Sequence, residues 1–121
     1  MKMIDFSMMK DPTKINLSFN EINIIQSLDN SHITKYYNSF QIENKLYIIM
    51  EYMDNWDLKG YLKAHKTMNK PIPEKEIWEI FYQCAVALNY IHRNKLIHRD
   101  IKLANLFMTN EKTIKIGDFY L

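Results

Sequence analysis

A set of charged and amide side chains in the last quarter of the chain has the types and spacing that phosphoryl transfer requires. The carboxylate Asp100 is followed two positions later by the ammonium group of Lys102 and five positions later by the amide of Asn105. A second carboxylate, Asp118, comes just after a short apolar segment. In transfer from a nucleotide, one carboxylate orients the attacking hydroxyl, a cation offsets charge on the phosphoryl group, and an amide and a second carboxylate hold Mg²⁺. The pattern therefore predicts phosphoryl-transfer chemistry.

These side chains belong to a longer pattern that resembles the catalytic loop and the magnesium loop of the protein kinase family. The matching residues are His98-Arg99-Asp100, Lys102, Asn105 and Asp118-Phe119. A lysine two positions after the aspartate is typical of serine/threonine kinases. The resemblance implies that Asp100 is the base, or the group that aligns the substrate hydroxyl, and that Lys102 stabilises the γ-phosphoryl group. It also implies that Asn105 and Asp118 coordinate Mg²⁺.

The resemblance assigns a phosphate-binding pair to the first part of the chain. In the family, a strand lysine contacts the α- and β-phosphates of ATP and pairs with a helix glutamate. Lys2 and Glu21, which are 19 residues apart, would take these roles. Lys2 could instead be a solvated N-terminal lysine, and Glu21 an exposed glutamate on a helix.

The segment Met50-Glu51-Tyr52-Met53 resembles the hinge that binds adenine through backbone groups. By this resemblance the carbonyl of Glu51 and the amide and carbonyl of Met53 contact the base, and Phe107 lies beneath it. Asp57 resembles the carboxylate that bonds the ribose hydroxyls. Asp57 could also be the N-cap of a following helix, and both roles can coexist.

Apolar periodicity predicts an α+β fold. Helices are predicted at 15–28 (ending at the turn 29–31), 58–66 and 74–93. Strands are predicted at 36–42, 46–51, 106–108 and 113–116, and residues 1–6 could form the end of a strand. The resemblance implies a partial kinase-like domain over 1–121. Residues 1–50 would be the N-lobe remnant with the αC helix and two strands, 51–57 the hinge, and 58–121 the first half of the helical C-lobe.

The chain departs from the family pattern in ways that bear on activity. Its only glycines are Gly60 and Gly117, so a glycine-rich phosphate loop is not present, and Tyr120 stands where the magnesium loop has glycine. The helix that covers the apolar stripe of 74–93 in the family has no counterpart, so we expect much of that stripe to face water. The resemblance, which extends to the NIMA-related kinases through segments 54–58 and 77–88, implies a serine/threonine kinase fragment. The alternative is a non-catalytic remnant that binds a partner through the exposed helix face.

Composition limits the classes of protein to which the chain could belong. The chain of 121 residues has one cysteine, Cys84, so it forms no intramolecular disulfide and suits a reducing compartment. A net charge of +2 is too small to favour nucleic acid. No apolar run reaches the length of a membrane span, and the first residues lack the apolar core of a signal peptide. We expect an intracellular, cytoplasmic protein whose partners are ATP and a protein substrate; the oligomeric state is left open.

Overall fold

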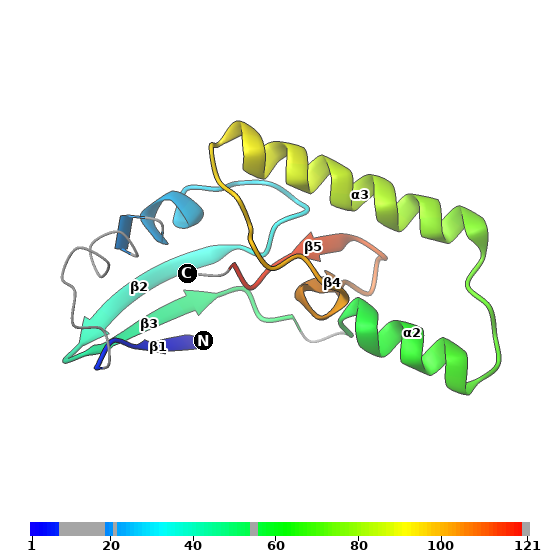
Figure 1. Ribbon diagram of the computed structural model, residues 1–121, viewed down its shortest axis with the longest axis horizontal. Coiled ribbons are helices and arrows are strands. Elements are labelled where there is room, and N and C mark those ends of the chain that lie inside the picture. Colours follow the sequence, from blue (N-terminus) through cyan, green and yellow to red (C-terminus); the bar gives the residue numbers. More distant parts are fainter. Residues whose placement is uncertain (8–18, 21, 54–55, 120–121) are drawn as a thin grey trace. The chain divides into compact units, whose positions relative to one another are not determined.

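The computed structural model describes residues 1–7, 19–20, 22–53 and 56–119 (Figure 1). Helices and strands are both present, so the predicted α+β class is confirmed. The chain divides into two compact units. Among the described residues, the first unit comprises those of Met1–Asp29 and Lys35–Tyr52, and the second comprises those of Asn30–Thr34 and Met53–Tyr120.

The first unit is built on an antiparallel sheet with the strand order β1-β3-β2. Its strands are β1 (Lys2–Asp5), β2 (Tyr36–Ile42) and β3 (Lys45–Met50). Alternate side chains of a strand point to opposite faces, and on β3 the alternate residues Leu46 and Ile48 are fully buried. The prediction for β2 is correct, and that for β3 is displaced by one residue at each end.

A short helical segment accompanies this sheet. Residues 19–20 and 22–26 are helical, and Ile22 and Ile25 are buried. The prediction that this helix ends at 29–31 is wrong, because the helical residues end at Gln26. The hydroxyl of Ser27 donates to the carbonyl of Ile24 over 2.7 Å, a local bond that competes with the helical ladder. Residues 15–18 and Glu21 lie outside the described residues, so their part of the prediction stays untested.

The described part of the second unit contains two α-helices, a 3₁₀ helix and a two-stranded antiparallel sheet (Figure 1). Its elements are α2 (Leu58–Thr67), α3 (Glu74–Arg93), the 3₁₀ helix η1 (Leu103–Asn105), β4 (Leu106–Met108) and β5 (Ile114–Ile116). The Asp57 side chain caps α2 by accepting a hydrogen bond from the Gly60 amide over 2.6 Å. At the other helix, Asn94 follows the last turn of α3 and its Nδ2 donates to the Tyr90 carbonyl over 2.8 Å. The predicted positions of both helices are confirmed, to within one residue at the end of α2.

Hydrogen bonds from both sides fix β5 within the second unit. The Ile116 amide donates to the His32 carbonyl over 2.9 Å, and the Thr34 amide donates to the Ile116 carbonyl over 2.9 Å. From α3, the Gln83 Oε1 accepts a hydrogen bond from the Ile114 amide over 2.8 Å. Ile114 and Ile116 are fully buried. The strand that leads to Asp118 is therefore held in register by backbone and side-chain bonds.

The apolar stripe of α3 is buried only near its C-terminal end. Ile91 is fully buried, whereas Ile77 is 52% exposed and Phe81 is 63% exposed. Exposure of much of the stripe was expected from the sequence and is confirmed. None of the helices in the described part of the chain has both the length and the apolar character needed to cross a bilayer.

Candidate active site

Asp100 is the centre of a hydrogen-bonded cluster in the second unit. Lys102 Nζ donates to Asp100 Oδ2 over 2.7 Å. Asn105 Nδ2 donates to the same oxygen over 2.9 Å and to the Asp100 carbonyl over 2.8 Å. The structure therefore brings together three of the residues that the sequence predicted for phosphoryl transfer. The fixed carboxylate leaves its other oxygen, Oδ1, for a hydroxyl group.

The charge of Asp100 is stabilised by these neighbours. The hydrogen bond from Lys102 is the largest cause that lowers the pKa of Asp100 below its ordinary value. Burial is the next largest effect and opposes it, and the hydrogen bond from the Asn105 amide lowers the pKa further. Hydrogen bonds to the ionised form favour that form. Asp100 is thus an anion near neutral pH, as an acceptor or aligner of a hydroxyl proton must be.

His98 connects this cluster to the segment that carries Asp118. Its side chain is 1% exposed. Nδ1 lies 3.3 Å from the Asp100 amide and Nε2 lies 2.8 Å from the Gly117 carbonyl. Since an amide only donates and a carbonyl only accepts, the proton is assigned to Nε2. The imidazole also packs against the Phe119 ring at a centroid distance of 4.6 Å. One buried side chain therefore fixes the spacing between the two loops.

Asn105 and Asp118 offer oxygen atoms of the kind that Mg²⁺ prefers. The Gly117 amide donates to the Asn105 carbonyl over 3.0 Å, which joins the backbones on which the two side chains are carried. Because Asn105 uses its Nδ2 toward Asp100, its Oδ1 is the atom for a cation. Over the described ranges, no group of three or more His, Cys, Asp or Glu side chains could hold a metal. A set of two protein ligands fits Mg²⁺, which keeps several waters and substrate phosphates.

Two residues predicted to contact the nucleoside lie next to each other. Asp57 and Phe107 form an antiparallel bridge, and the Met108 amide donates to the Trp56 carbonyl over 3.1 Å beside it. Phe107 is half-buried. The N-cap role of Asp57 is confirmed by its bond to α2. Its contact with ribose, and that of Phe107 with adenine, stay predictions.

The other predicted ATP residues are distributed between the units. Met53, in the second unit, is half-buried. Lys2 lies on β1 opposite Ile48 of β3, and Glu51 follows β3, so both belong to the first unit. The Glu51 side chain accepts a hydrogen bond from the Lys35 amide over 3.0 Å, and its own amide donates to the Lys35 carbonyl over 2.7 Å. Glu21 lies outside the described residues, so its proposed pairing with Lys2 stays a prediction.

Sequence reasoning did not reveal two features of the site. Arg99 and Asp118 have φ values of 68° and 59°, in the left-handed region that non-glycine residues rarely occupy. Such backbone conformations cost free energy and tend to occur at functional sites. Gly117 packs so closely against Thr34 and Phe107 that a Cβ atom would collide with both. Neither feature has a local sequence signal beyond the glycine itself.

The fold and the cluster around Asp100 are those expected of a protein kinase domain. The chain belongs to this family, since the family model described as "Protein kinase domain" matches residues 1–121.

Comparison with curated relatives shows which members of the protein kinase family the chain resembles. The chain is 38% identical to the probable serine/threonine-protein kinase nek3 of Dictyostelium discoideum, over 89% of this chain and 10% of that protein. It is 38% identical to the probable serine/threonine-protein kinase nek2 of the same organism, over 99% of this chain and 30% of that protein. It is also 38% identical to the serine/threonine-protein kinase Nek3 of Mus musculus, over 79% of this chain and 18% of that protein. The chain thus spans less than a third of the length of these relatives, and it resembles the NIMA-related serine/threonine kinases.

Proposed function

We propose that the site around Asp100 transfers the γ-phosphoryl group of ATP to serine or threonine hydroxyls of a protein substrate. The observation that carries this proposal is the cluster in which Lys102 and Asn105 both bond to one oxygen of Asp100. Family membership and the similarity to serine/threonine kinases support it. The change of unit between Tyr52 and Met53 supports a division into an N-lobe part at 1–50, a hinge at 51–57 and a C-lobe part at 58–121.

Each residue of the cluster has a distinct task in this proposal. Asp100 accepts a hydrogen bond from the substrate hydroxyl and so directs a lone pair of the hydroxyl oxygen toward the phosphorus atom of the γ-phosphoryl group. Lys102, which lies 2.7 Å from Asp100 and is partly exposed, offsets negative charge on the transferred group. Asn105 and Asp118 hold Mg²⁺, which when bound neutralises charge on the ATP phosphates. His98 is a positioning residue, because it bonds to both loops and reaches neither reactant in this scheme.

The proposal is tested by phosphate transfer from labelled ATP to a generic protein substrate. Asp100→Asn keeps the size of the side chain and removes its charge, and it should lower the transfer rate by about 100-fold or more. Asp29→Asn is the matched control, since the Asp29 side chain is 89% exposed and lies in the other unit. Transfer that is equal in the unsubstituted chain and in Asp100→Asn would refute the proposal.

A second candidate function, a non-catalytic module that binds a partner protein, is favoured by one observation. The aromatic side chains of Trp78, Phe81 and Tyr82 on α3 are all more than half exposed. A measurement of Mg²⁺-dependent ATP binding separates the two candidate functions, because a transferase must bind both and a partner-binding module need not. Calorimetric titration that detects ATP binding only in the presence of Mg²⁺, and loses it in Asp118→Asn, supports the transferase. No binding in either case supports the module.

A further inference from the structure

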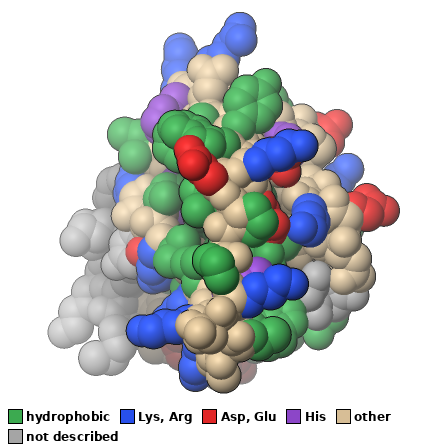
Figure 2. Space-filling view, turned by 90° about the vertical axis from the view of Figure 1, so that its right-hand side faces the viewer, with side chains coloured by type: hydrophobic (Ala, Val, Ile, Leu, Met, Phe, Trp, Pro, Cys, Tyr) green, Lys and Arg blue, Asp and Glu red, His purple; other side chains and the backbone are tan. Residues whose placement is uncertain are grey.

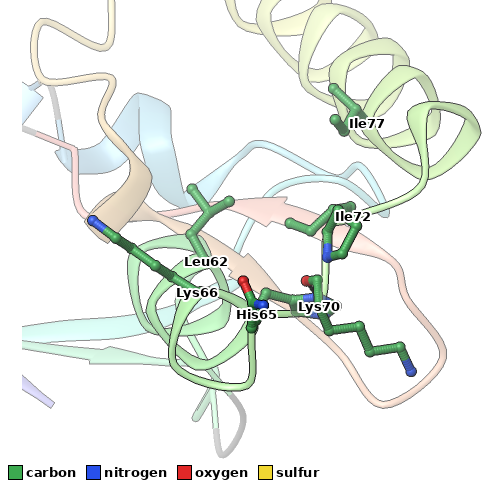
Figure 3. Close-up of a pocket in the computed structure, with 8 residues that line it drawn as sticks. Leu62, His65, Lys66, Lys70, Ile72 and Ile77 are labelled. Carbon is green, nitrogen blue, oxygen red and sulfur yellow. Dashed lines mark hydrogen bonds between the residues drawn. The ribbon is translucent and has the colours of Figure 1, made fainter.

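A pocket of about 550 Å³ lies between the C-terminal end of α2, the α2–α3 connection and the start of α3. All of its lining belongs to the second unit. Its apolar part is made by Leu62, Pro71, Ile72 and Ile77. Figure 3 shows Leu62 on α2 and Ile72 on the connection facing the same space, with Ile77 above them on α3. A volume of this size accommodates one or two side chains of a partner.

The polar part of the pocket is entirely basic or neutral. It consists of His65, Lys66, Asn69 and Lys70, and it includes no carboxylate. The ammonium groups of the two lysines lie on opposite sides of the pocket in Figure 3. Among the described residues, neither lysine forms an ion pair. Of the carboxylates at the start of α3, Glu74 bonds to Trp78, and Glu76 bonds to Tyr61 and Lys112.

This basic character extends along the chain around the pocket. Residues 58–73 contain four lysines and no acidic residue, for a charge of +4. The whole chain has a net charge of +2, so the charges outside this segment sum to −2. Figure 2, which faces the side of the molecule with the α2–α3 connection, shows lysine, hydrophobic and some acidic side chains next to one another on this surface. The segment therefore combines the strongest positive charge of the chain with an open apolar pocket.

Helix stability explains only part of this arrangement. His65 and Lys66 lie in the last turn of α2, where positive groups interact favourably with the helix dipole. His65 Nδ1 also donates to the Lys70 carbonyl over 2.9 Å, which fixes the start of the connection. Neither effect involves the Lys70 ammonium group, which lies beyond the helix. Neither effect accounts for the exposure of the apolar lining residues Leu62 and Ile77, which are 40% and 52% exposed.

We propose that this pocket is a docking site for an acidic peptide segment of a partner protein that carries an adjacent pair of large apolar side chains. The apolar side chains enter the space between Leu62, Ile72 and Ile77. The flanking carboxylates of the peptide pair with Lys66 and Lys70. Charge complementarity identifies the acidic part of the partner, and the concave apolar floor identifies the hydrophobic part, which a nucleic acid or another polyanion lacks.

The docking site is separate from the candidate active site but lies on the same helix. Asp57 caps the N-terminal end of α2, and the pocket lies at its C-terminal end. With a rise of about 1.5 Å per residue, a ten-residue helix separates the two by roughly 15 Å. A docked segment therefore leaves the nucleoside-binding residues uncovered. Docking requires neither ATP nor Asp100, so its test is independent of the proposed transferase.

The test uses the 121-residue chain and a fluorescein-labelled peptide of sequence Gly-Glu-Asp-Phe-Leu-Glu-Asp-Gly, with binding followed by fluorescence anisotropy. Lys66→Glu with Lys70→Glu should weaken binding by about tenfold or more, because two attractive charge pairs become repulsive. Lys59→Glu with Lys63→Glu is the matched control, since it changes the same charge on the same helix outside the pocket. The control variant should change the affinity for the peptide by less than about threefold, because its charges act on the peptide only over a distance at which salt screens them.

Further variants separate specific docking from general adhesion of polyanions. Ile72→Ser should weaken binding of the peptide by about fivefold or more, through lost apolar contact. The same peptide with Ser-Ser in place of Phe-Leu should bind at least tenfold more weakly. Circular dichroism verifies that each variant keeps its helix content, and Lys66→Gln with Lys70→Gln replaces the charge reversal if it does not.

Three results would overturn the proposal. Equal losses in the pocket and control lysine variants would indicate adhesion to the basic helix as a whole. Equal binding of the Ser-Ser peptide, or of heparin, would show that the apolar floor contributes nothing. Sedimentation that detects a dimer which dissociates in Ile72→Ser would assign the pocket to a second copy of this chain.

Discussion

Replacement of Gly117 by alanine tests the packing around the backbone segment that carries Asp118. A Cβ atom at position 117 would lie 2.6 Å from Thr34 Oγ1, 3.0 Å from Phe107 Cε2 and 3.2 Å from Thr34 Cβ. Ordinary contact begins at 3.4 Å, so the shortest of these falls short by 0.8 Å. No glycine of the described residues has a positive φ, so alanine meets a lack of space rather than a forbidden backbone conformation.

The surrounding groups have little freedom to move away. The Thr34 amide is bonded to the Ile116 carbonyl over 2.9 Å, and Thr34 is 2% exposed. The Gly117 amide and carbonyl are bonded to Asn105 and His98 over 3.0 and 2.8 Å. Relief of the collision therefore breaks at least one of these hydrogen bonds or compresses the core. It also shifts the backbone that carries Asp118.

The cost follows from these two effects. Overpacking of a filled core costs about 1–3 kcal/mol, and the loss of one hydrogen bond adds about 1 kcal/mol. We expect Gly117→Ala to lower the free energy of unfolding by about 2–4 kcal/mol, a large part of a typical margin of about 5–15 kcal/mol. Urea unfolding followed by circular dichroism should show a midpoint lower by about 1–2 M.

A double substitution separates this account from a general effect of alanine. Thr34→Ala removes Oγ1, which has no hydrogen-bond partner in the described structure, and so relieves the shortest contact. Gly117→Ala combined with Thr34→Ala should be more stable than the sum of the two single effects predicts, by about 1 kcal/mol or more. Additive effects, or an unchanged midpoint for Gly117→Ala alone, would refute the packing argument.

Three further substitutions test charge and burial. Lys102→Met should raise the pKa of Asp100 toward its ordinary value, because Lys102 is the largest cause of the depression, and carbon NMR of the carboxyl group measures it. Burial raises the pKa of Tyr61 to about 12, with a further contribution from the hydrogen bond that its hydroxyl donates to Glu76, and the same hydrogen bond lowers the pKa of Glu76. This contact should stabilise the fold between the ordinary values of 4.5 and 10.0. Stability should be lost as the pH falls through the lowered pKa of Glu76 or rises through about 12. In a plot of melting temperature against pH, Glu76→Gln should flatten the acid limb and reduce the alkaline limb only in part, because burial is the larger cause of the raised pKa of Tyr61. Phe81→Glu should change the free energy of unfolding by less than about 0.5 kcal/mol, because Phe81 is 63% exposed, and a loss above 2 kcal/mol in urea would show that the ring is packed.

Most of the elements could be predicted because their signals are local. The strand β2 and the helix α3 have the predicted bounds, since alternation and three- to four-residue periodicity arise from strand and helix geometry themselves. The end of the helical segment at Gln26 was not predicted, because a single hydroxyl, that of Ser27, forms the competing bond. Periodicity continues through Leu28, which is buried although it is not helical. Burial alone therefore does not mark a helix end.

The members of the candidate site could be predicted, but their contacts could not. Motif spacing identifies Asp100, Lys102 and Asn105, whose separations in the chain are short. The bond from His98 to the Gly117 carbonyl joins residues 19 positions apart and depends on tertiary structure. The left-handed backbone of Asp118, with φ of 59°, is likewise not indicated by motif spacing.

Asn105 shows why an amide is suited to its position in this cluster. Its backbone amide donates to the Lys102 carbonyl over 2.8 Å, its carbonyl accepts from Gly117 over 3.0 Å, and its side chain donates twice to Asp100. A carboxylate there would have no proton to donate and would lie against the charge of Asp100. An aliphatic side chain would leave the buried bonds unmade. A side chain with both an N–H donor and an oxygen acceptor can hold Asp100 in place and still present an oxygen to a cation, so a single amide suits both tasks that the proposed transfer assigns to this position.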